Sequence, residues 1–567
     1  MSDLALFSPG LILIVGGLLL PVIPKFLRPA FMLVLPVLGF AYILGLENGT
    51  SVTMNYLGLT LEYLRVDRLS LMWGYIFHIA AFLGLLYALQ VKDTMQQVAA
   101  LIYAGSAISA VFAGDLITLF VFWELTAVSS VFLIWASRTP SAYRSGMRYL
   151  IIQVGSGVIL LSGILLYVNQ TGSLVFGPIG IESTAGKLIL IAFGIKSAFP
   201  LLHNWLQDSY PEATPSGTVI LSTFTTKLAI YALARGYAGT DILIYIGATM
   251  TAFPIFFAVI ENDLRRVLSY SLNNQLGFMV TGIGLGTELG INGAAAHAFV
   301  HILYKSLLFM SMGAVLQRTG TIKATNLGGL YKTMPWTAGF CTIGAMSISA
   351  FPLFSGFVTK SMILTAAAGD GYWGVWIVLL MASAGVMEHS GIKIPYFSFF
   401  AHDSGKRPKE APLNMLLAMG ITAALSIGIG IYPDPLYAIL PFPVDYTPYT
   451  LAHVLTQLQL LMFSVLAFIF LMKSGLYPPE TASVNIDSDV VYRKFLPALI
   501  DKFGKSVAAM DMAGRVRSLS FIKNFIGTVR ATHGVTSPLA SNMAVSSMVV
   551  WALMSLAVYL VVLFMAT

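Results

Sequence analysis

The chain has 567 residues, of which 57% are hydrophobic and 10% are charged, and its mean hydropathy is +0.81. Soluble domains carry about 25% charged residues, so this composition excludes a soluble globular protein and predicts an all-α membrane protein with many spans. The net charge of +7 alone would suit a nucleic-acid partner, and the single cysteine, Cys341, permits no internal disulfide.

Apolar runs long enough to cross a bilayer recur almost throughout the chain. The segment before the first run holds Asp3 and no basic residue, which favours a retained helix over a cleaved signal peptide. The run from Trp336 to Ala368 is too long for one straight helix and contains Pro352 and Gly356, so it predicts two half-helices. We predict about sixteen spans, at Leu4–Ile23, Pro29–Leu46, Leu69–Gln90, Met95–Ala113, Leu116–Ala136, Tyr149–Val168, Leu188–Leu206, Gly217–Tyr237, Ile242–Ile260, Val267–Leu285, Ile291–Leu316, Trp336–Ala368, Trp373–Phe399, Leu413–Tyr432, Val454–Met472 and Val545–Met565.

Two segments do not read as spans. Glu47–Asp67 alternates apolar and polar residues around Gly58, which predicts a small external hairpin. Val484–His533 combines apolar residues with lysine and arginine at helical spacing, which predicts an amphipathic helix that its glycines could interrupt. This helix is either an ordinary interfacial helix or a lateral strap that holds neighbouring helices or subunits.

We therefore divide the chain into five parts. Residues 1–93 form N-terminal helices with the hairpin, and residues 94–432 form the core with the ion path. Residues 433–483 hold the penultimate span, residues 484–544 the cytoplasmic amphipathic segment, and residues 545–567 the last span.

Lysine and arginine concentrate in alternate loops, which fixes the expected orientation. If both termini lie outside, the basic clusters all fall in the cytoplasm, whereas the outer loops hold few basic residues. The positive charge is then a topology signal of a multi-pass membrane protein, and no nucleic-acid partner is expected. The cytoplasmic clusters are Lys25/Arg28, Lys92, Arg138/Arg144/Arg148, Arg265/Arg266, Arg318/Lys323/Lys332 and Lys406/Arg407/Lys409.

Several ionisable residues lie inside the predicted spans. Each would cost about 2.5–3.5 kcal/mol at bilayer depth if nothing solvated it. Six of them would together cost roughly 15–20 kcal/mol, more than the net stability of most domains. They need water or partner charges, and a hydrated charged track through a membrane predicts a path for ions. These residues are Glu124, Lys196, Lys227, Lys305, Lys360 and Lys393.

The first of these centres lies beside a predicted break. Pro200 follows Lys196 by four residues, so the backbone hydrogen bond that the Lys196 carbonyl would accept is missing. Broken helices at membrane depth occur where they are buried or line a cavity, and a lysine there is typical of a transport site. Glu124 needs a basic partner, for which Lys196 is the obvious candidate; the alternatives are a static buried salt bridge and snorkelling of the lysine.

His297, His301 and Lys305 follow at positions i, i+4 and i+8, which places them in one polar stripe on an apolar helix. Histidine exchanges protons near neutral pH, so the stripe predicts a relay, with structural hydrogen bonding as the alternative. Metal ligation is disfavoured because no third ligand follows at a telling spacing and Lys305 repels a cation. Lys360 repeats the pattern of a lysine after a break.

Secondary candidates flank these centres. They are His203, Asp208, Glu388, His389 and Lys393. His389 and Lys393 stand at i and i+4, and Lys393 lies towards the cytoplasmic end, so snorkelling explains it about as well as transport does.

Taken together, these stretches resemble the antiporter-like membrane subunits shared by Mrp-type cation/proton antiporters, respiratory complex I and membrane-bound hydrogenases. The resemblance covers about Asp67 to Tyr432 and rests on FWEL, the lysine before PLLHNWL, TKLAIYALAR, DLRRVLSYSLNNQLGFM, HAFVHILYKSLLF and GFVTK. It implies fourteen core helices with two inverted five-helix repeats, each with a broken helix. It also implies a path from the Glu124–Lys196 pair through Lys227 and the histidine stripe to Lys360.

Within that family the stretch MEHSGIKIPYFSFF looks most similar to D-type Mrp subunits. The long amphipathic segment before the last span instead resembles the complex I subunit with a lateral helix. Arg265 stands where the family often has a lysine, which keeps the charge but removes an easily titrated group.

We therefore expect a proton- and cation-translocating subunit of a multisubunit Na⁺/H⁺ antiporter, with other membrane subunits and the lipid bilayer as partners. The sequence holds no cysteine cluster, nucleotide loop or flavin motif, so we expect no catalytic residues, no metal and no cofactor in this chain. Three alternatives stay open. The first is a proton-pumping subunit of a complex I-like or hydrogenase complex, in which case the chain is part of a redox-driven translocase. The second is a membrane partner that energises inorganic-carbon uptake, and the third is a carrier for an organic solute.

Overall fold

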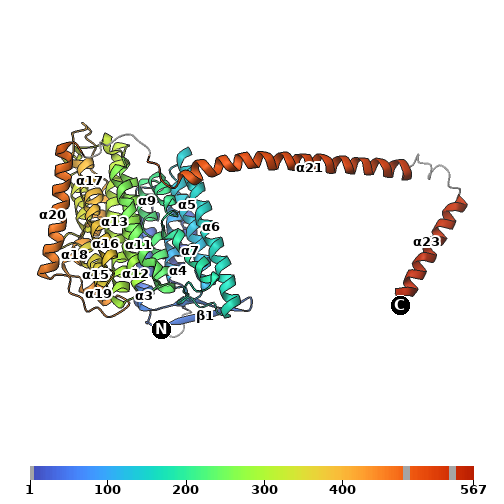
Figure 1. Cartoon of the computed structure of the whole chain (residues 1–567), viewed down its shortest axis with the longest axis horizontal. Helices are drawn as coiled ribbons and strands as arrows, with labels where there is room; N and C mark the ends of the chain where they lie inside the picture. The colour runs from blue at the N-terminus through green and yellow to red at the C-terminus, as the bar shows by residue number, and fades with distance from the viewer. Residues whose placement is uncertain (1–5, 477–484, 535–544, 567) are drawn as a thin grey trace. The chain divides into compact units, whose positions relative to one another are not determined.

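The computed structural model describes residues 6–476, 485–534 and 545–566, and the chain divides into two units, Met1–Asn485 and Ile486–Thr567. The first unit is a helical bundle with one small hairpin, and the second holds two long helices (Figure 1). Among the described residues, ten helices are long and apolar enough to cross a membrane by themselves. The polytopic all-α fold is therefore confirmed, while the number of about sixteen spans stays a prediction.

The bundle begins with two short apolar helices, α1 (Leu11–Leu19, extended by a 3-10 turn to Val22) and α2 (Arg28–Leu44). Strands β1 (Ser51–Tyr56) and β2 (Leu59–Arg65) then pair antiparallel, with Tyr56 opposite Leu59 across the turn. Gly58 adopts φ +78° in that turn, a conformation that glycine accepts without strain. The predicted hairpin is confirmed.

The remaining helices of the bundle run from α3 to α20, and several of them are halves of interrupted spans. Half of these helices start at aspartate, serine or threonine N-caps, whose side chains accept hydrogen bonds from the first-turn N–H groups. Their bounds are α3 Arg68–Tyr87, α4 Thr94–Val111, α5 Leu116–Trp135, α6 Pro140–Thr171, α7 Thr184–Lys196, α8 Asn204–Ser209, α9 Pro215–Leu221, α10 Thr225–Gly236, α11 Ile242–Ile260, α12 Leu264–Leu285, α13 Glu288–Thr319, α14 Pro335–Ile348, α15 Ser355–Gly369, α16 Trp373–Val386, α17 Lys393–Pro395, α18 Leu413–Ile431, α19 Asp434–Ala438 and α20 Leu451–Ser474.

Two helix breaks in the bundle share the sequence Ser-Ala-Phe-Pro-Leu. The first, Ser197–Leu201, follows α7, and the second, Ser349–Leu353, follows α14. In both copies the alanine and the leucine have positive φ, between 57° and 75°. Such values are uncommon outside glycine and concentrate at functional sites. The half-helices predicted within Trp336–Ala368 are confirmed, and the repeated pentapeptide marks two equivalent breaks.

Other stretches depart from the expectation of straight helices. The span predicted at Gly217–Tyr237 is interrupted at residues 222–224, between α9 and α10. The span predicted at Trp373–Phe399 changes to π-helix over Met387–Ile392 and again over Tyr396–Phe400. A π-helical turn carries one residue more than an α-helical turn and occurs frequently at functional sites. The pattern of apolar residues alone gave no sign of either irregularity.

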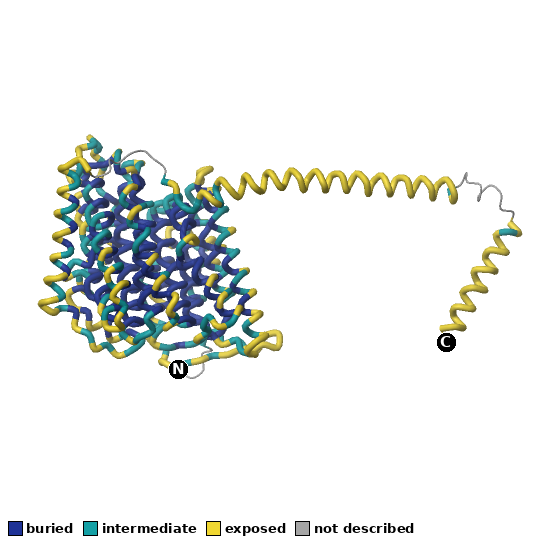
Figure 2. Tube along the Cα trace, viewed as in Figure 1, coloured by how far each residue is buried: buried dark blue, intermediate teal, exposed yellow. Residues whose placement is uncertain are grey.

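Helix α13 is the centre of the bundle. Almost all of its membrane-length window is buried, and it packs against α9, α12, α14, α15 and α18. Figure 2 shows the buried residues concentrated in the interior of the first unit. A helix in such a position is expected to be apolar all round. The polar side chains of α13 are exceptions to that expectation, and the surrounding helices keep them from solvent.

The second unit consists of a short π-helical segment, Val491–Phe495, followed by α21 (Leu496–His533), and of α23 (Val545–Ala566). Helix α21 runs unbroken through Gly504, Gly514 and Gly527 and spans about 57 Å at 1.5 Å per residue. Neither helix holds a buried residue. Parts of the predicted domains, residues 477–484 and 535–544, lie outside the described residues.

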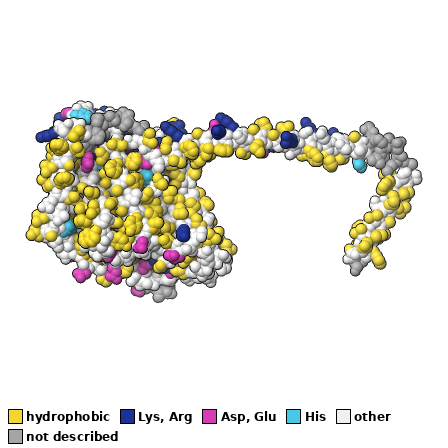
Figure 3. All heavy atoms as spheres, viewed as in Figure 1, with side chains coloured by type: hydrophobic (Ala, Val, Ile, Leu, Met, Phe, Trp, Pro, Cys, Tyr) yellow, Lys and Arg dark blue, Asp and Glu magenta, His cyan; other side chains and the backbone are white. Residues whose placement is uncertain are grey.

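Charge is distributed unevenly over the first unit. Figure 3 shows acidic side chains gathered at the end of the bundle that carries the hairpin, and basic side chains at the other end. This distribution agrees with the loop asymmetry on which the orientation rests.

Candidate functional site

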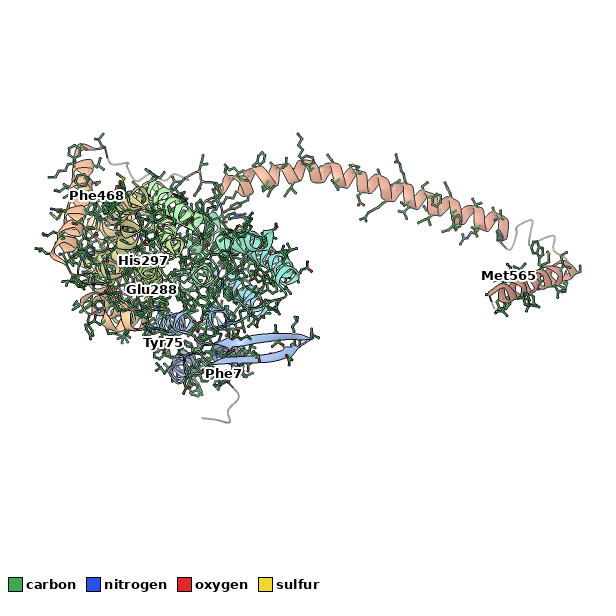
Figure 4. All side chains as sticks on the ribbon, turned by 60° about the horizontal axis from the view of Figure 1, so that its bottom comes forward. Phe7, Tyr75, Glu288, His297, Phe468 and Met565 are labelled. Carbon is green, nitrogen blue, oxygen red and sulfur yellow. The ribbon has the colours of Figure 1, made fainter. Side chains whose placement is uncertain are left out.

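The ionisable residues predicted within the spans lie in the interior of the bundle. Lys196, Lys227, Lys305 and Lys360 are each at most 1% exposed, as are His297 and His301. Figure 4 places His297 inside the bundle, on the same helix as Glu288. The structure therefore brings together four lysines and two histidines in a setting that excludes bulk water.

The first centre lies between α5, α6 and the end of α7. Lys196 Nζ donates to the carbonyl of Trp123 at 2.5 Å and to Thr126 Oγ1 at 3.2 Å, and lies 4.3 Å from the centroid of the Trp123 ring. Glu124 is half-buried and interacts electrostatically with Lys196. Its carboxylate rests on Gly157 of α6, where a Cβ atom would lie within 1.6 Å of Oε1.

The direct Glu124–Lys196 hydrogen bond that the pairing implies is not formed. The lysine is bound by the carbonyl and the hydroxyl of α5, and Glu124 Oε1 has no hydrogen-bond partner among the described residues. The two groups interact without a direct hydrogen bond, because the ammonium is bound by Trp123, which directly precedes Glu124, and by Thr126, two residues after it. A small movement of either side chain would make or break their contact.

Hydroxyl groups connect this centre to α10. Ser130 Oγ, one turn after Thr126, lies 2.8 Å from Tyr149 OH on α6. Tyr149 also interacts with Thr225, whose hydroxyl lies 2.6 Å from Tyr103 OH. Thr225 is two residues from Lys227, so a row of hydroxyl groups leads from one lysine towards the next.

Three lysines bind carbonyls at the C-terminal ends of helices. Lys227 Nζ donates to Ser222, the C-cap of α9, at 2.5 Å, and Lys360 Nζ to Ile348, the last residue of α14, at 3.0 Å. Lys393 Nζ donates to Val259, near the end of α11, at 2.5 Å. A helix C-terminus offers unsatisfied carbonyls and partial negative charge, which stabilise a cation there.

Lys305 and His301 differ from these lysines. Lys305 Nζ and both ring nitrogens of His301 have no hydrogen-bond partner among the described residues, although all are buried. His301 packs edge-on against Tyr304 at 5.3 Å between ring centroids. Buried polar groups without protein partners typically bind internal water, so this part of the stripe has the character of a hydrated site.

His297 links α13 to α12 and α15. Its Nδ1 lies 3.0 Å from Thr359 Oγ1, and its Nε2 lies 3.1 Å from Gln275 Oε1 and 3.2 Å from Tyr304 OH. Thr359 directly precedes Lys360, whose ammonium lies 5.0 Å from the centroid of the Phe278 ring. The histidine can thus pass a proton between the stripe and the second broken helix, with the tautomer set by these partners.

The secondary candidates divide into two groups. Asp208 lies apart from the lysines and forms a two-pronged ion pair with Arg148, at 2.7 and 2.8 Å, while His203 packs against the Phe253 ring at 4.6 Å. His389 Nδ1 lies 2.9 Å from Ser390 Oγ in the π-helical turn, and Glu388 is half-buried.

Lys393 is buried, and its Nζ reaches the carbonyl of Val259 near the end of α11; its role in transport stays a prediction. Lys393 interacts electrostatically with both Glu388 and His389 of the π-helical segment, and His389 also interacts with Lys305 and Lys360. Among the described residues, no group of three histidine, cysteine or acidic side chains lies close enough to hold a metal ion.

Several polar residues of the site escape prediction from the sequence. Thr126 lies next to Lys196, and Gln275 and Thr359 bind His297, yet single hydroxyls and amides inside apolar helices carry little signal.

For Arg265 the sequence indicates only the charge. Its buried guanidinium binds the carbonyls of Pro211 and Ala213 and fixes the loop between α8 and α9.

The known proteins to which this chain is similar are subunits of membrane complexes. Residues 113–387 match the family model described as NADH:quinone oxidoreductase/Mrp antiporter, transmembrane. The D-type component of the Na(+)/H(+) antiporter of Alkalihalophilus pseudofirmus is 30% identical over 350 residues, which cover 57% of this chain and 70% of that protein. Hydrogenase-4 component B of Escherichia coli is 26% identical over 373 residues, covering 58% of this chain and 55% of that protein.

A solved structure of the Mrp complex from Dietzia sp. DQ12-45-1b contains a chain with the same fold. The TM-score is 0.68 at 21% identity, and the match covers 79% of this chain and 98% of that chain. The matched family model includes both breaks and all of the buried lysines except Lys393.

Proposed function

Because the chain belongs to the membrane family that the NADH:quinone oxidoreductases share with the Mrp antiporters, we propose that it is the proton- and cation-translocating subunit of a multisubunit Na⁺/H⁺ antiporter. The observation that carries the proposal is the buried row of Lys196, Lys227, Lys305 and Lys360, none of which forms an ion pair with a carboxylate among the described residues. If these lysines served only the fold, they would lower its stability, because each charged lysine at bilayer depth costs about 2.5–3.5 kcal/mol of free energy.

The route begins at Glu124 and Lys196. A proton that arrives at this pair changes the attraction between the carboxylate and the ammonium, since a neutral partner no longer holds the other charge. Lys196 is held by weak neutral acceptors, a carbonyl and a hydroxyl, so it is able to change partner. The hydroxyl row of Ser130, Tyr149 and Thr225 then leads towards Lys227.

The central part of the route runs along α13. Lys227 and Lys305 interact electrostatically, and each also interacts with His301. Their like charges disfavour simultaneous protonation, so a proton on one lysine favours release from the other. His297 then continues through Thr359 to Lys360 at the second break.

Lys360 ends the buried row, as the family resemblance implies. Its ammonium caps the free carbonyl of Ile348, one residue before the second Ser-Ala-Phe-Pro-Leu break. A rearrangement of that break would remove the acceptor and release the lysine. The two strained breaks are therefore the proposed moving parts, at opposite ends of the row.

We place both termini outside a bacterial cytoplasmic membrane, with residues 94–432 as the transporting core. We assign the amphipathic helix α21 to the cytoplasmic membrane surface, where its apolar residues Phe503, Phe521 and Phe525 contact lipid or neighbouring subunits. These three phenylalanines are each more than half exposed in the unit by itself. Other membrane subunits complete the complex.

The proposal is tested in inverted membrane vesicles that contain the chain with its neighbouring subunits. A pH gradient is imposed, and Na⁺, K⁺ or an electron donor is added. An antiporter is supported if Na⁺ collapses the gradient in wild-type vesicles and does not collapse it in Lys360→Ala vesicles that hold the assembled complex. A gradient that responds only to an electron donor would instead assign the chain to a redox-driven complex, to which its likeness to a hydrogenase component also points.

A further inference from the structure

A groove between α4 and α5 lies outside the proposed ion path. It encloses about 350 Å³ and is lined mainly by apolar side chains of the two helices, among them Val98, Ile102, Leu125, Val128 and Phe132. Val128 is 45% exposed, so the groove opens at the outer face of the bundle. Helix α5 is long and apolar enough to cross a membrane, and the sequence predicts a span at α4, so we expect this opening to face the hydrocarbon region of the bilayer.

A buried arginine lies at one end of this groove. Arg28 Nη1 donates to Thr94 Oγ1 at 2.7 Å, and Nη2 donates to the carbonyl of Pro21 at 3.0 Å, and both Thr94 and Pro21 line the groove. Its Nε donates to the carbonyl of Ile23 at 2.9 Å. All three acceptors are neutral, so the positive charge of Arg28 is positioned but not neutralised.

Within the described part of the chain Arg28 has no acidic partner, because Asp93, which directly precedes Thr94, pairs with Arg138 at 2.8 Å. Arg28 is 9% exposed, and no carboxylate of the described residues forms an ion pair with it. Lys25 and Lys92 are exposed, three residues before Arg28 and two residues before Thr94. A guanidinium has five N–H donors, of which the three contacts above use three, so two remain for an anion.

We propose that this groove is a binding site for one anionic phospholipid of the cytoplasmic leaflet. The phosphate lies against Arg28, and one acyl chain lies along α4 and α5. Basic pockets between membrane helices on the cytoplasmic side are the expected sites for anionic headgroups. From Thr94 to Ile102 the groove follows eight residues of helix, about 12 Å, which accommodates part of one acyl chain.

The dimensions and the charge decide between a lipid and a protein helix. A helix of a partner subunit is about 10–12 Å across and is too wide to enter a space of this volume over this length. An uncharged lipid would fill the apolar part but leave Arg28 without a counter-charge. The site adjoins the first ion-pair centre, because Leu125 of the groove directly follows Glu124.

The test compares lipid retention by the full chain in its complex. The purified complex is titrated with phosphatidylglycerol or phosphatidylcholine, and bound lipid is counted by native mass spectrometry and followed by thermal stabilisation. Arg28→Gln removes the charge, Val128→Trp fills the groove from its exposed rim, and Arg144→Gln is the control because Arg144 is an exposed basic residue elsewhere on the chain.

We expect the wild type and Arg144→Gln to bind phosphatidylglycerol at least 10-fold more tightly than phosphatidylcholine. Arg28→Gln should lose that preference, and Val128→Trp should lose retention of both lipids. Equal binding of the two lipids by the wild type, or an unchanged preference in Arg28→Gln, would overturn the proposal. So would a cross-link from Val128→Cys to a partner subunit at full yield with lipid present. If Arg28→Gln does not fold, the wild-type preference and Val128→Trp still decide.

Discussion

Replacing Arg265 by methionine should destabilise the bundle more than any exposed charge substitution. The guanidinium is 2% exposed and donates to Pro211 at 3.0 Å and to Ala213 at 2.8 Å, and no other hydrogen bond among the described residues reaches these two carbonyls. Hydrogen bonds from charged groups contribute about 1.5–3 kcal/mol each. Losing both bonds should therefore lower the free energy of unfolding by about 3–6 kcal/mol.

The measurement is thermal and denaturant unfolding of the purified chain in detergent, with Arg144→Met as the matched control because Arg144 is exposed. Arg265→Lys keeps the charge, but its single nitrogen cannot reach both carbonyls, so it should recover less than half of the loss. An Arg265→Met variant within about 1 kcal/mol of the wild type would refute the reasoning, since that result means that the loop between α8 and α9 is held by other contacts.

Two further predictions concern the Glu124–Lys196 centre and the loop that precedes α18. Gly157→Ala should move the Glu124 carboxylate, because the added Cβ would lie within 1.6 Å of Oε1, and vesicle transport should fall about 10-fold; Gly155→Ala, where no atom lies within 4 Å, should leave transport unchanged. Arg407 and a second cation hold the pKa of Asp403 well below its usual range. A lowered pKa means that the contact stabilises the loop above about pH 4 and is lost as the pH falls below that value. Proteolysis of the loop should therefore accelerate on acidification in the wild type, whereas Asp403→Asn should be cleaved rapidly at every pH.

The fold was largely predictable because the composition of the chain and the spacing of its apolar, glycine and proline residues determine most of its elements. Apolar runs gave the helices, alternation around Gly58 gave the hairpin, and Pro352 with Gly356 gave the second break. The break at residues 222–224 was not predictable, because that stretch holds neither proline nor glycine.

The candidate site was predictable in its charged members and not in its neutral ones. A lysine in an apolar run is costly and therefore conspicuous, so Lys196, Lys227 and Lys360 were found. Their acceptors are backbone carbonyls such as those of Ser222 and Ile348, which every residue carries, so no residue type announces them. The repeated Ser-Ala-Phe-Pro-Leu pentapeptide was a readable signal that a search for internal repeats would have found.

The absence of a hydrogen bond between Glu124 and Lys196 could likewise not be predicted from the sequence. The sequence predicts that Glu124 and Lys196 act as a pair; the two groups interact electrostatically, and their pairing in transport stays a prediction. The sequence contains nothing to indicate that Trp123 and Thr126 would hold the ammonium instead of the carboxylate. Which acceptor binds a lysine depends on differences of an ångström in packing, and spacing along a helix does not specify them.

The most direct test of the central claim is Na⁺-dependent collapse of an imposed pH gradient in inverted vesicles that carry the complete complex. Lys196→Ala and Glu124→Ala are compared with the wild type and with Lys187→Ala, an exposed lysine on the same helix α7 as Lys196. The account predicts that the wild type and Lys187→Ala collapse the gradient, and that both buried variants fail to do so while the complex stays assembled. Wild-type rates in Lys196→Ala and Glu124→Ala would contradict it, because the buried charges would then be structural and the path would run elsewhere.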